Sequence, residues 1–234
     1  LSIYTKYMGK KIISFSLWGN ISLYCIGAIK NALLAKKIFP GWICRYYYDN
    51  SVPEIIINYL KSLDNTELIY IEKPSGGTQY KDNGTFGSLW RFLVCIDPNI
   101  DIYLVCDTDS RLNLYLKNAT EILFTKKYNF IRFVDLPSNY PIMACGFIGL
   151  QNAVNFNSDA MLKFNGGKFY CDQEFLKEII FPQICNTCLT LPRKHHKNPE
   201  LFVPKITGTY VGQVVDEYDV SIDKNGNQAF NLKN

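Results

Sequence analysis

The sequence lacks long apolar runs and long basic runs. No stretch approaches the roughly 20 consecutive apolar residues that a membrane-spanning helix needs, and the start of the chain does not have the pattern of a signal peptide. The net charge of +4 is spread along the chain, without the clustered lysines and arginines that bind nucleic acid. We therefore expect no membrane span and no nucleic-acid partner.

Histidine is also scarce, and the cysteines lack the spacing of a disulfide framework. The two histidines are adjacent, at His195 and His196. The eight cysteines are scattered through apparent strands as often as through loops, so we expect reduced, buried thiols in a cytoplasmic protein. Cys185 and Cys188 have the spacing of half a zinc site, but one pair of thiols with two adjacent histidines is a weak zinc motif.

The composition is that of a packed globular chain. Hydrophobic residues make up 47% and charged residues 20%, and 234 residues are enough for one α/β domain with a full core. We see no internal repeat and no dividing linker. We expect residues 1–9 to be a leader or tag remnant, residues 10–216 to form the domain, and residues 217–234 to be a polar tail.

Strands and helices are expected to alternate through the first half. Apolar, β-branched runs predict strands, and apolar residues at helical spacing between them predict helices. This alternation is typical of a mostly parallel sheet with helices on both faces. The expected strands are residues 11–17, 42–49, 67–72 and 102–105, and the expected helices are residues 23–39, 53–63, 88–95 and 112–125.

The pattern is less regular after Asn129. Two glycines in residues 142–150 suggest that the backbone there lies close to a ligand or to another segment. We expect strands at residues 130–134 and 209–215, a helix at residues 172–184, and loops at residues 74–87 and 185–204, while residues 142–150 form a further apolar run.

Two aspartates, Asp107 and Asp109, follow the apolar stretch of residues 102–106. Ligands of open α/β sheets bind at the carboxyl ends of strands. Neighbouring carboxylates repel one another, and a divalent cation such as Mg²⁺ or Mn²⁺ removes that cost. The pair therefore predicts a metal site that binds substrate phosphates. The alternative is a pair that caps a helix or lies in solvent.

The acid pair at a strand end, after three strand–helix units, resembles the metal-dependent glycosyltransferases of the GT-A fold. Further motifs occur in the order found in a small chlorella-virus-like group, which is encoded by large DNA viruses of algae. The resemblance covers residues 11–215 and implies a single-domain, Rossmann-like α/β fold with a mostly parallel central sheet. The motifs are Phe15-Ser16-Leu17-Trp18-Gly19, Pro40-Gly41-Trp42 with Arg45 and Asp49, Trp90-Arg91-Phe92, Asp107-Thr108-Asp109-Ser110-Arg111, and Asp172-Gln173 with Phe175-Leu176.

The resemblance implies a nucleotide site at the ends of the first strands. Phe15, Ser16 and Leu17 would face the nucleotide base. Asp49 and Arg91 would contact the nucleoside or its phosphates. Without the resemblance, Arg91 reads equally well as a surface charge on a helix.

The resemblance also implies metal ligands and a base. Asp107 and Asp109 would hold ribose and metal, and His195 or His196 would be a late metal ligand. Asp172 would lie at the acceptor hydroxyl and act as general base if the reaction inverts. The simpler readings are exposed loop histidines and, for Asp172, an acid in the first turn of a helix.

The activity implied is transfer of a hexose from a UDP- or GDP-sugar to a glycan or protein-linked acceptor, with Mn²⁺ or Mg²⁺. The protein would be located in the cytoplasm, which would be that of the host cell if the chain is virus-encoded. The chain departs from the family pattern at Cys106, where the family has an arginine. Two alternatives stay open: a catalytically weak nucleotide- or carbohydrate-binding module, and an Asp-x-Asp phosphotransferase, whose acid pair normally follows the first strand.

Overall fold

The computed structural model describes residues 9–72, 86–125, 128–134, 140–164, 170–192, 212, 214–220 and 222. Its centre is a seven-stranded sheet with the strand order β3-β2-β1-β4-β6-β5-β7. The strands are β1 (Lys10–Leu17), β2 (Ile43–Tyr48), β3 (Thr66–Tyr70), β4 (Ile100–Val105), β5 (Phe130–Val134), β6 (Phe147–Leu150) and β7 (Cys188–Pro192).

Most strand pairs are parallel, and only β6 runs against its neighbours. β1 pairs in parallel with β2 and β4, and β2 pairs in parallel with β3. β6 is antiparallel to both β4 and β5, whereas β5 and β7 are parallel. Because β1 and β4 run together, with Ser14 opposite Val105, their carboxyl ends open at the same edge of the sheet.

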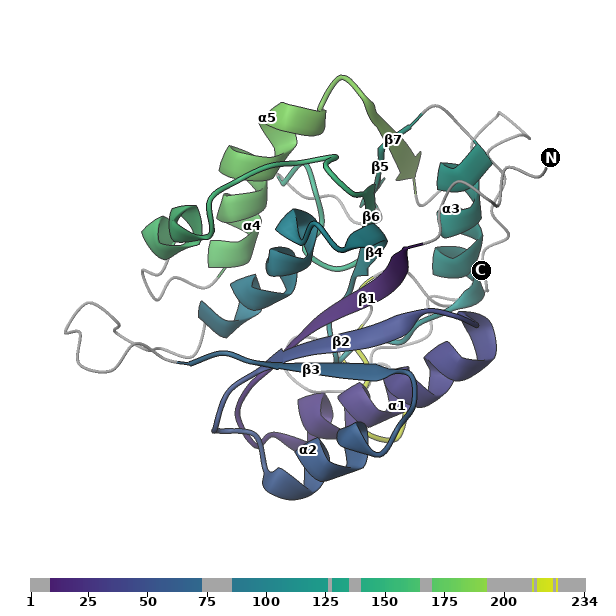
Figure 1. The fold of residues 1–234 in the computed structure, drawn as a ribbon, viewed down its shortest axis with the longest axis vertical. Coiled ribbons are helices and arrows are strands. Elements are labelled where there is room, and N and C mark those ends of the chain that lie inside the picture. The colour runs from purple at the N-terminus through teal and green to yellow at the C-terminus, as the bar shows by residue number, and fades with distance from the viewer. Residues whose placement is uncertain are drawn as a thin grey trace.

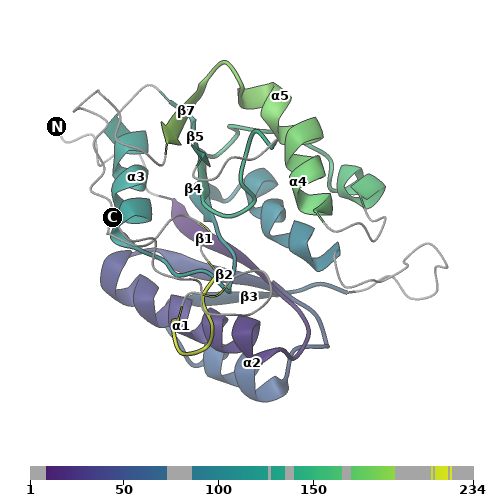
Figure 2. The ribbon, with the colours of Figure 1, turned by 180° about the vertical axis from the view of Figure 1, so that it is seen from behind.

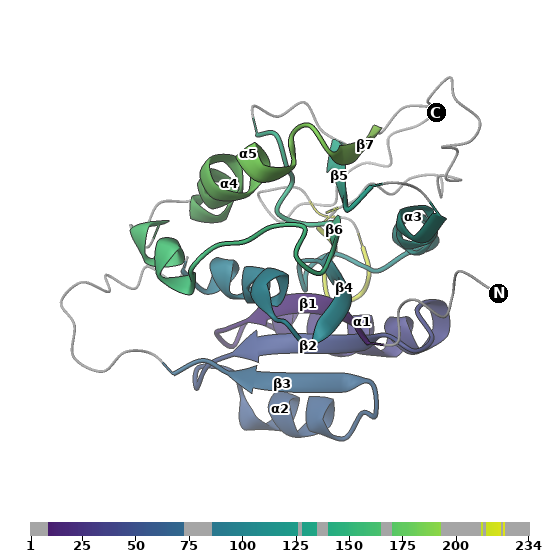
Figure 3. The same cartoon turned by 45° about the horizontal axis from the view of Figure 1, so that its top comes forward.

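Helices cover both faces of this sheet, as Figures 1 and 3 show. One core cluster joins the sheet to α1, α2 and α3, and a second joins it to η2, α4, η4 and α5. The predicted fold class, a single α/β domain with a mostly parallel sheet, is therefore confirmed. The helices are α1 (Ser22–Ile38), α2 (Glu54–Lys61), η2 (Phe86–Ile96), α3 (Leu114–Thr125), η3 (Ser158–Phe164), α4 (Cys171–Phe175), η4 (Leu176–Ile180) and α5 (Phe181–Ile184).

Several expected elements differ in detail. The helix expected at residues 88–95 is a 3₁₀ helix, and within the apolar run at residues 142–150 the strand is Phe147–Leu150. The prediction of a loop at residues 185–204 is wrong for Cys188–Pro192. These residues form β7, which pairs with β5. Of the strand expected at residues 209–215, Val215 makes an isolated bridge, and residues 209–211 and 213 lie outside the described residues. Most of the expected loop at residues 74–87 lies outside them too.

A glycine in β6 explains the close packing of two strands. A Cβ on Gly149 would lie only 2.2 Å from the Tyr103 hydroxyl, so the Tyr103 ring covers this backbone directly. The expectation that a glycine of this segment lies against another chain segment is confirmed.

All eight cysteines are free thiols, and six of them are buried. Cys185 is exposed, so the expectation of buried thiols fails at this position. Among the described residues, no helix combines the length and apolarity that crossing a bilayer requires.

Candidate functional site

A pocket of about 180 Å³ lies at the carboxyl edge of the parallel strands. β4 delivers Asp107 and Asp109 to it, η2 delivers Arg91, and α4 delivers Asp172. With Ser16 of β1, the structure therefore brings together five of the predicted site residues from four separate elements. The pocket is lined by Ser16, Trp18, Tyr24, Ser88, Arg91, Asp107, Thr108, Asp109 and Asp172.

Arg91 links the two acidic sides of the pocket. Its two terminal nitrogens each lie 2.9 Å from a carboxylate oxygen, one of Asp107 and one of Asp172. The side chain is 4% exposed, so the surface reading of Arg91 is wrong. Burial opposes the charge, but the attraction of Asp107 and Asp172 outweighs it and raises the pKa of Arg91. Arg91 is therefore a fixed cation that orients both carboxylates.

Two serines of β1 hold this arginine in place. The Ser14 hydroxyl donates to the Arg91 carbonyl (2.7 Å), and the Arg91 amide donates to the Ser16 hydroxyl (2.9 Å). Both serines are buried. A buried hydroxyl needs such a partner, so the polar positions in this apolar strand are explained by their bonds to η2.

The carboxylates outnumber the cations of the pocket lining. Asp107, Asp109 and Asp172 face only Arg91 within that lining, which leaves an excess of two negative charges when all three are ionised. Burial, and then the charge of Asp107, raise the pKa of Asp109 from 3.8 to about 7. Burial also raises the pKa of Asp172, although Arg91 opposes this. The site is therefore short of positive charge, as expected of a place that binds a cation.

Helix α1 supports the acidic loop from behind. A Cβ on Gly27 would lie 2.1 Å from the Thr108 carbonyl oxygen, so only glycine permits this approach. The Asn31 amide, fully buried, donates to the carbonyls of Thr108 (3.3 Å) and Ser110 (2.8 Å). Its oxygen accepts from the Leu112 amide at 3.1 Å. Three bonds from one side chain fix the loop that carries the aspartates.

A late segment of the chain, residues 214–220, braces the same loop from outside. The Val215 amide donates to the Asp109 carbonyl at 2.8 Å. Asp219 accepts from both Arg111 and Lys30 at 2.7 Å, which ties the acidic loop, α1 and this segment together. Figure 2 shows the segment in yellow beside α1. Nothing in the sequence pattern predicts these contacts, because Asp219 lies 108 positions from Arg111 and 189 from Lys30.

Aromatic side chains form one wall of the pocket. The rings of Trp18 and Tyr24 are stacked, with centroids 6.4 Å apart and planes at 13°. Burial, and then the charges of Asp109 and Asp107, raise the pKa of Tyr24. In the sequence Trp18 belongs to one of the motifs that carry the resemblance, whereas Tyr24 gives no signal.

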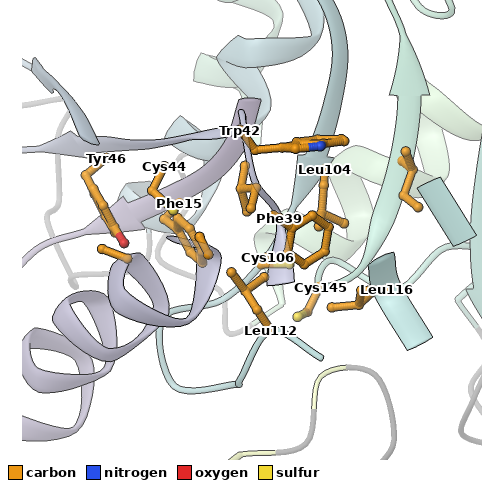
Figure 4. Packing of buried hydrophobic residues seen from close by; sticks show 14 of the residues in the cluster. Phe15, Phe39, Trp42, Cys44, Tyr46, Leu104, Cys106, Leu112, Leu116 and Cys145 are labelled. Carbon is orange, nitrogen blue, oxygen red and sulfur yellow. The ribbon is translucent and has the colours of Figure 1, made fainter. Parts of the chain in front are cut away.

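Three residues expected at the nucleotide do not line the pocket: two lie in the core, and one contacts the loop after β1. Phe15 and Leu17 are fully buried, and Phe15 stacks on Tyr46 at 5.0 Å within the core (Figure 4), so neither side chain lines the pocket. Asp49, at the end of β2, accepts from the Ser51 amide at 3.0 Å and from its hydroxyl. That hydroxyl accepts from the amide of Gly19 (2.7 Å), so Asp49 helps to fix the loop after β1.

Asp107 and Asp109 suit a divalent cation by their chemistry. Both offer hard carboxylate oxygens, and Mg²⁺ is commonly held by one or two carboxylates with substrate phosphates and water. The described part of the chain contains no cluster of three side chains able to bind a metal. His195 and His196 lie outside the described residues, so their metal role stays a prediction.

Comparisons with known proteins found weak structural likenesses only. No family model matches the chain, and no curated protein matches it. A solved glycosyltransferase involved in the glycosylation of the major capsid of PBCV-1 is 16% identical over 78% of this chain and 81% of that one, with a TM-score of 0.45. Glucosyl-3-phosphoglycerate synthase from Mycobacterium tuberculosis, in complex with Mg²⁺ and UDP, is 8% identical over 86% and 77%, with a TM-score of 0.47.

A third neighbour carries a different enzyme name. The 4-diphosphocytidyl-2C-methyl-D-erythritol synthase from Anaerococcus prevotii is 10% identical over 82% of this chain and 94% of that one, with a TM-score of 0.42. Likenesses this weak assign no activity, so function is argued from the side chains of the pocket.

Proposed function

We propose that the chain, with residues 10–216 as its domain, is a metal-dependent glycosyltransferase. It would move a hexose from a UDP- or GDP-sugar to a hydroxyl of a glycan or a protein-linked acceptor. One observation carries the proposal: three aspartates surround a single buried arginine in one pocket, at the carboxyl edge of a mostly parallel sheet. The family resemblance of the motifs that supply these residues gives independent support.

The acid pair would bind the metal. Asp107 and Asp109 would hold Mn²⁺ or Mg²⁺, with His195 or His196 as a predicted further ligand. When bound, the cation would neutralise the charge that develops on the diphosphate leaving group. The excess of carboxylates in the pocket supports this assignment, because two unneutralised negative charges there are costly.

The strand ends would bind the nucleotide. Ser16, Trp18 and Tyr24 line the pocket beside the acid pair, and the stacked rings offer a flat apolar wall to a base or a sugar. Asp49 would act here by holding the loop after β1 through Ser51. The expected direct contact of the Phe15 and Leu17 side chains with the base is not part of this proposal, because both side chains lie in the core.

Arg91 and Asp172 would serve the transfer step. In an inverting reaction, the acceptor oxygen forms a bond to the anomeric carbon while the bond from that carbon to the diphosphate oxygen breaks. The diphosphate leaves with the electron pair, and Asp172 accepts the hydroxyl proton. Burial raises the pKa of Asp172, and Arg91 would oppose this and orient the carboxylate, because its charge favours the carboxylate form.

A panel of sugar nucleotides tests the proposal. Wild-type protein with Mn²⁺ is expected to release a nucleoside diphosphate from at least one UDP- or GDP-hexose, and Asp109→Asn is expected to abolish this release. If no donor is turned over, the enzyme proposal fails. Nucleotide binding that Asp109→Asn leaves unchanged would instead indicate a binding module.

A further inference from the structure

Two tyrosines lie beside the acidic end of the pocket, on segments far apart in the sequence. Tyr140 precedes β6 and Tyr170 precedes α4, yet their ring centroids are 6.1 Å apart with planes at 40°. Tyr170 is 56% exposed. We call this pair, Tyr140 and Tyr170, the tyrosine ledge. Tyr140 is partly exposed, so the two rings together form an apolar surface in an otherwise polar part of the site.

The ledge adjoins the pocket at Asp172, which lies near enough to Tyr140 to affect its hydroxyl. Tyr170 stands two residues before Asp172, which lines the pocket and binds Arg91. Cys171, between them, has its sulfur 3.6 Å from the Ser88 hydroxyl, and Ser88 is also a lining residue. A molecule resting on the ledge would therefore meet the Asp172 carboxylate at its inner end.

The backbone at Tyr170 is held in an uncommon conformation. Its φ of 73° and ψ of 22° lie in the left-handed region, which is unusual for a bulky residue. Such conformations cost free energy and persist where the surrounding structure enforces them, which is often at binding sites. This geometry supports a role for Tyr170 but does not by itself define a ligand.

Carboxylates lie at the edges of the rings. Glu174 forms a hydrogen bond with Tyr140, and both Asp172 and Tyr170 lie near enough to Tyr140 to affect its hydroxyl. A pyranose ring offers the matching chemistry, because its C–H face packs on aromatic rings while its hydroxyls donate to carboxylates.

We propose that the tyrosine ledge is the acceptor site and that it binds a saccharide ring whose reactive hydroxyl points to Asp172. This inference rests on the proposed transferase function and names the class of its acceptor. Tyr140 and Tyr170 would hold the apolar face of the ring, and Glu174 would bind an outer hydroxyl.

Tyr170→Gly is the informative variant, because glycine adopts a positive φ without strain and removes only the ring. The probes are methyl and p-nitrophenyl hexosides, offered with the sugar nucleotide that wild type hydrolyses. The ratio of transfer to hydrolysis is expected to fall about tenfold or more, as loss of a stacked ring from a weak complex implies. Tyr170→Phe should retain that ratio, and Tyr59→Ala, which removes an exposed ring on α2, should not change it. Equal losses of transfer and hydrolysis would overturn the proposal.

A second measurement separates failure of the ledge from failure of the function. If wild type turns over no sugar nucleotide, saturation-transfer NMR with the same hexosides reads binding directly. A binding signal in wild type that is lost in Tyr170→Gly and kept in Tyr59→Ala would support the saccharide site, even in the absence of catalysis. No signal in wild type, or equal signal in both variants, would overturn it.

Discussion

Replacing Asp109 by Asn tests the charge balance of the pocket through protein stability. Burial and Asp107 raise the pKa of Asp109 from 3.8 to about 7. Between these values the folded protein keeps a proton that the unfolded chain releases, so Asp109 destabilises the fold increasingly as pH rises. A shift of this size corresponds to about 4 kcal/mol. Because the side chain keeps some contact with solvent, we expect about half of that, on the order of 2 kcal/mol at pH 8.

The assay is urea unfolding of wild type and Asp109→Asn at pH 5 and pH 8, in EDTA. At pH 8 the variant should be more stable than wild type. At pH 5, where Asp109 is protonated in the folded protein, this stability difference should be less than half as large. Adding Mn²⁺ at pH 8 should stabilise wild type much more than the variant, since a ligand of the folded state raises its stability. Asp64→Asn, at an exposed position paired with Lys36, is the control. A stability difference equal at both pH values, or a less stable variant at pH 8, would refute the reasoning.

Three further substitutions probe the supports of the site. Arg91→Met leaves two carboxylates without their buried cation and should lower the free energy of unfolding in urea by about 3 to 5 kcal/mol. An unchanged stability would mean that the two ion pairs do not hold the fold. Gly27→Ala puts a methyl group against the Thr108 carbonyl and should weaken nucleotide binding about tenfold by calorimetry; unchanged affinity would mean that the acidic loop moves freely. Asp219→Asn removes an exposed partner of Arg111 and should cost under about 1 kcal/mol, measurably less at high salt; a cost that high salt leaves unchanged would contradict the ion-pair reading.

The sequence predicted the parts of the fold that follow from local pattern. Apolar runs and helical spacing located the strands and helices from β1 to α3, because those elements are buried in regular layers. β7 was missed, since five residues at a sheet edge carry little pattern and depend on pairing with β5. β6 was visible in the sequence only as part of an apolar run, because residues 142–146 are also largely apolar but form no strand.

The residues of the candidate site could likewise be predicted only in part. A strand ending in two acids was enough to place Asp107 and Asp109 in the pocket. The burial of Phe15 could not be foreseen, because an apolar residue at a strand end is equally compatible with core or ligand. Asn31 was missed as well. Its signal was a polar residue on the buried side of α1, and only the structure shows that it holds the acidic loop.

Titration calorimetry of UDP and GDP into wild-type protein tests the central claim most directly. In Mn²⁺ at least one of the two nucleotides should bind, and its affinity should fall at least about tenfold when EDTA removes the metal or when Asp109 is replaced by Asn. Binding of neither nucleotide in Mn²⁺, or the same affinity with and without the metal, would contradict a cation held by Asp107 and Asp109.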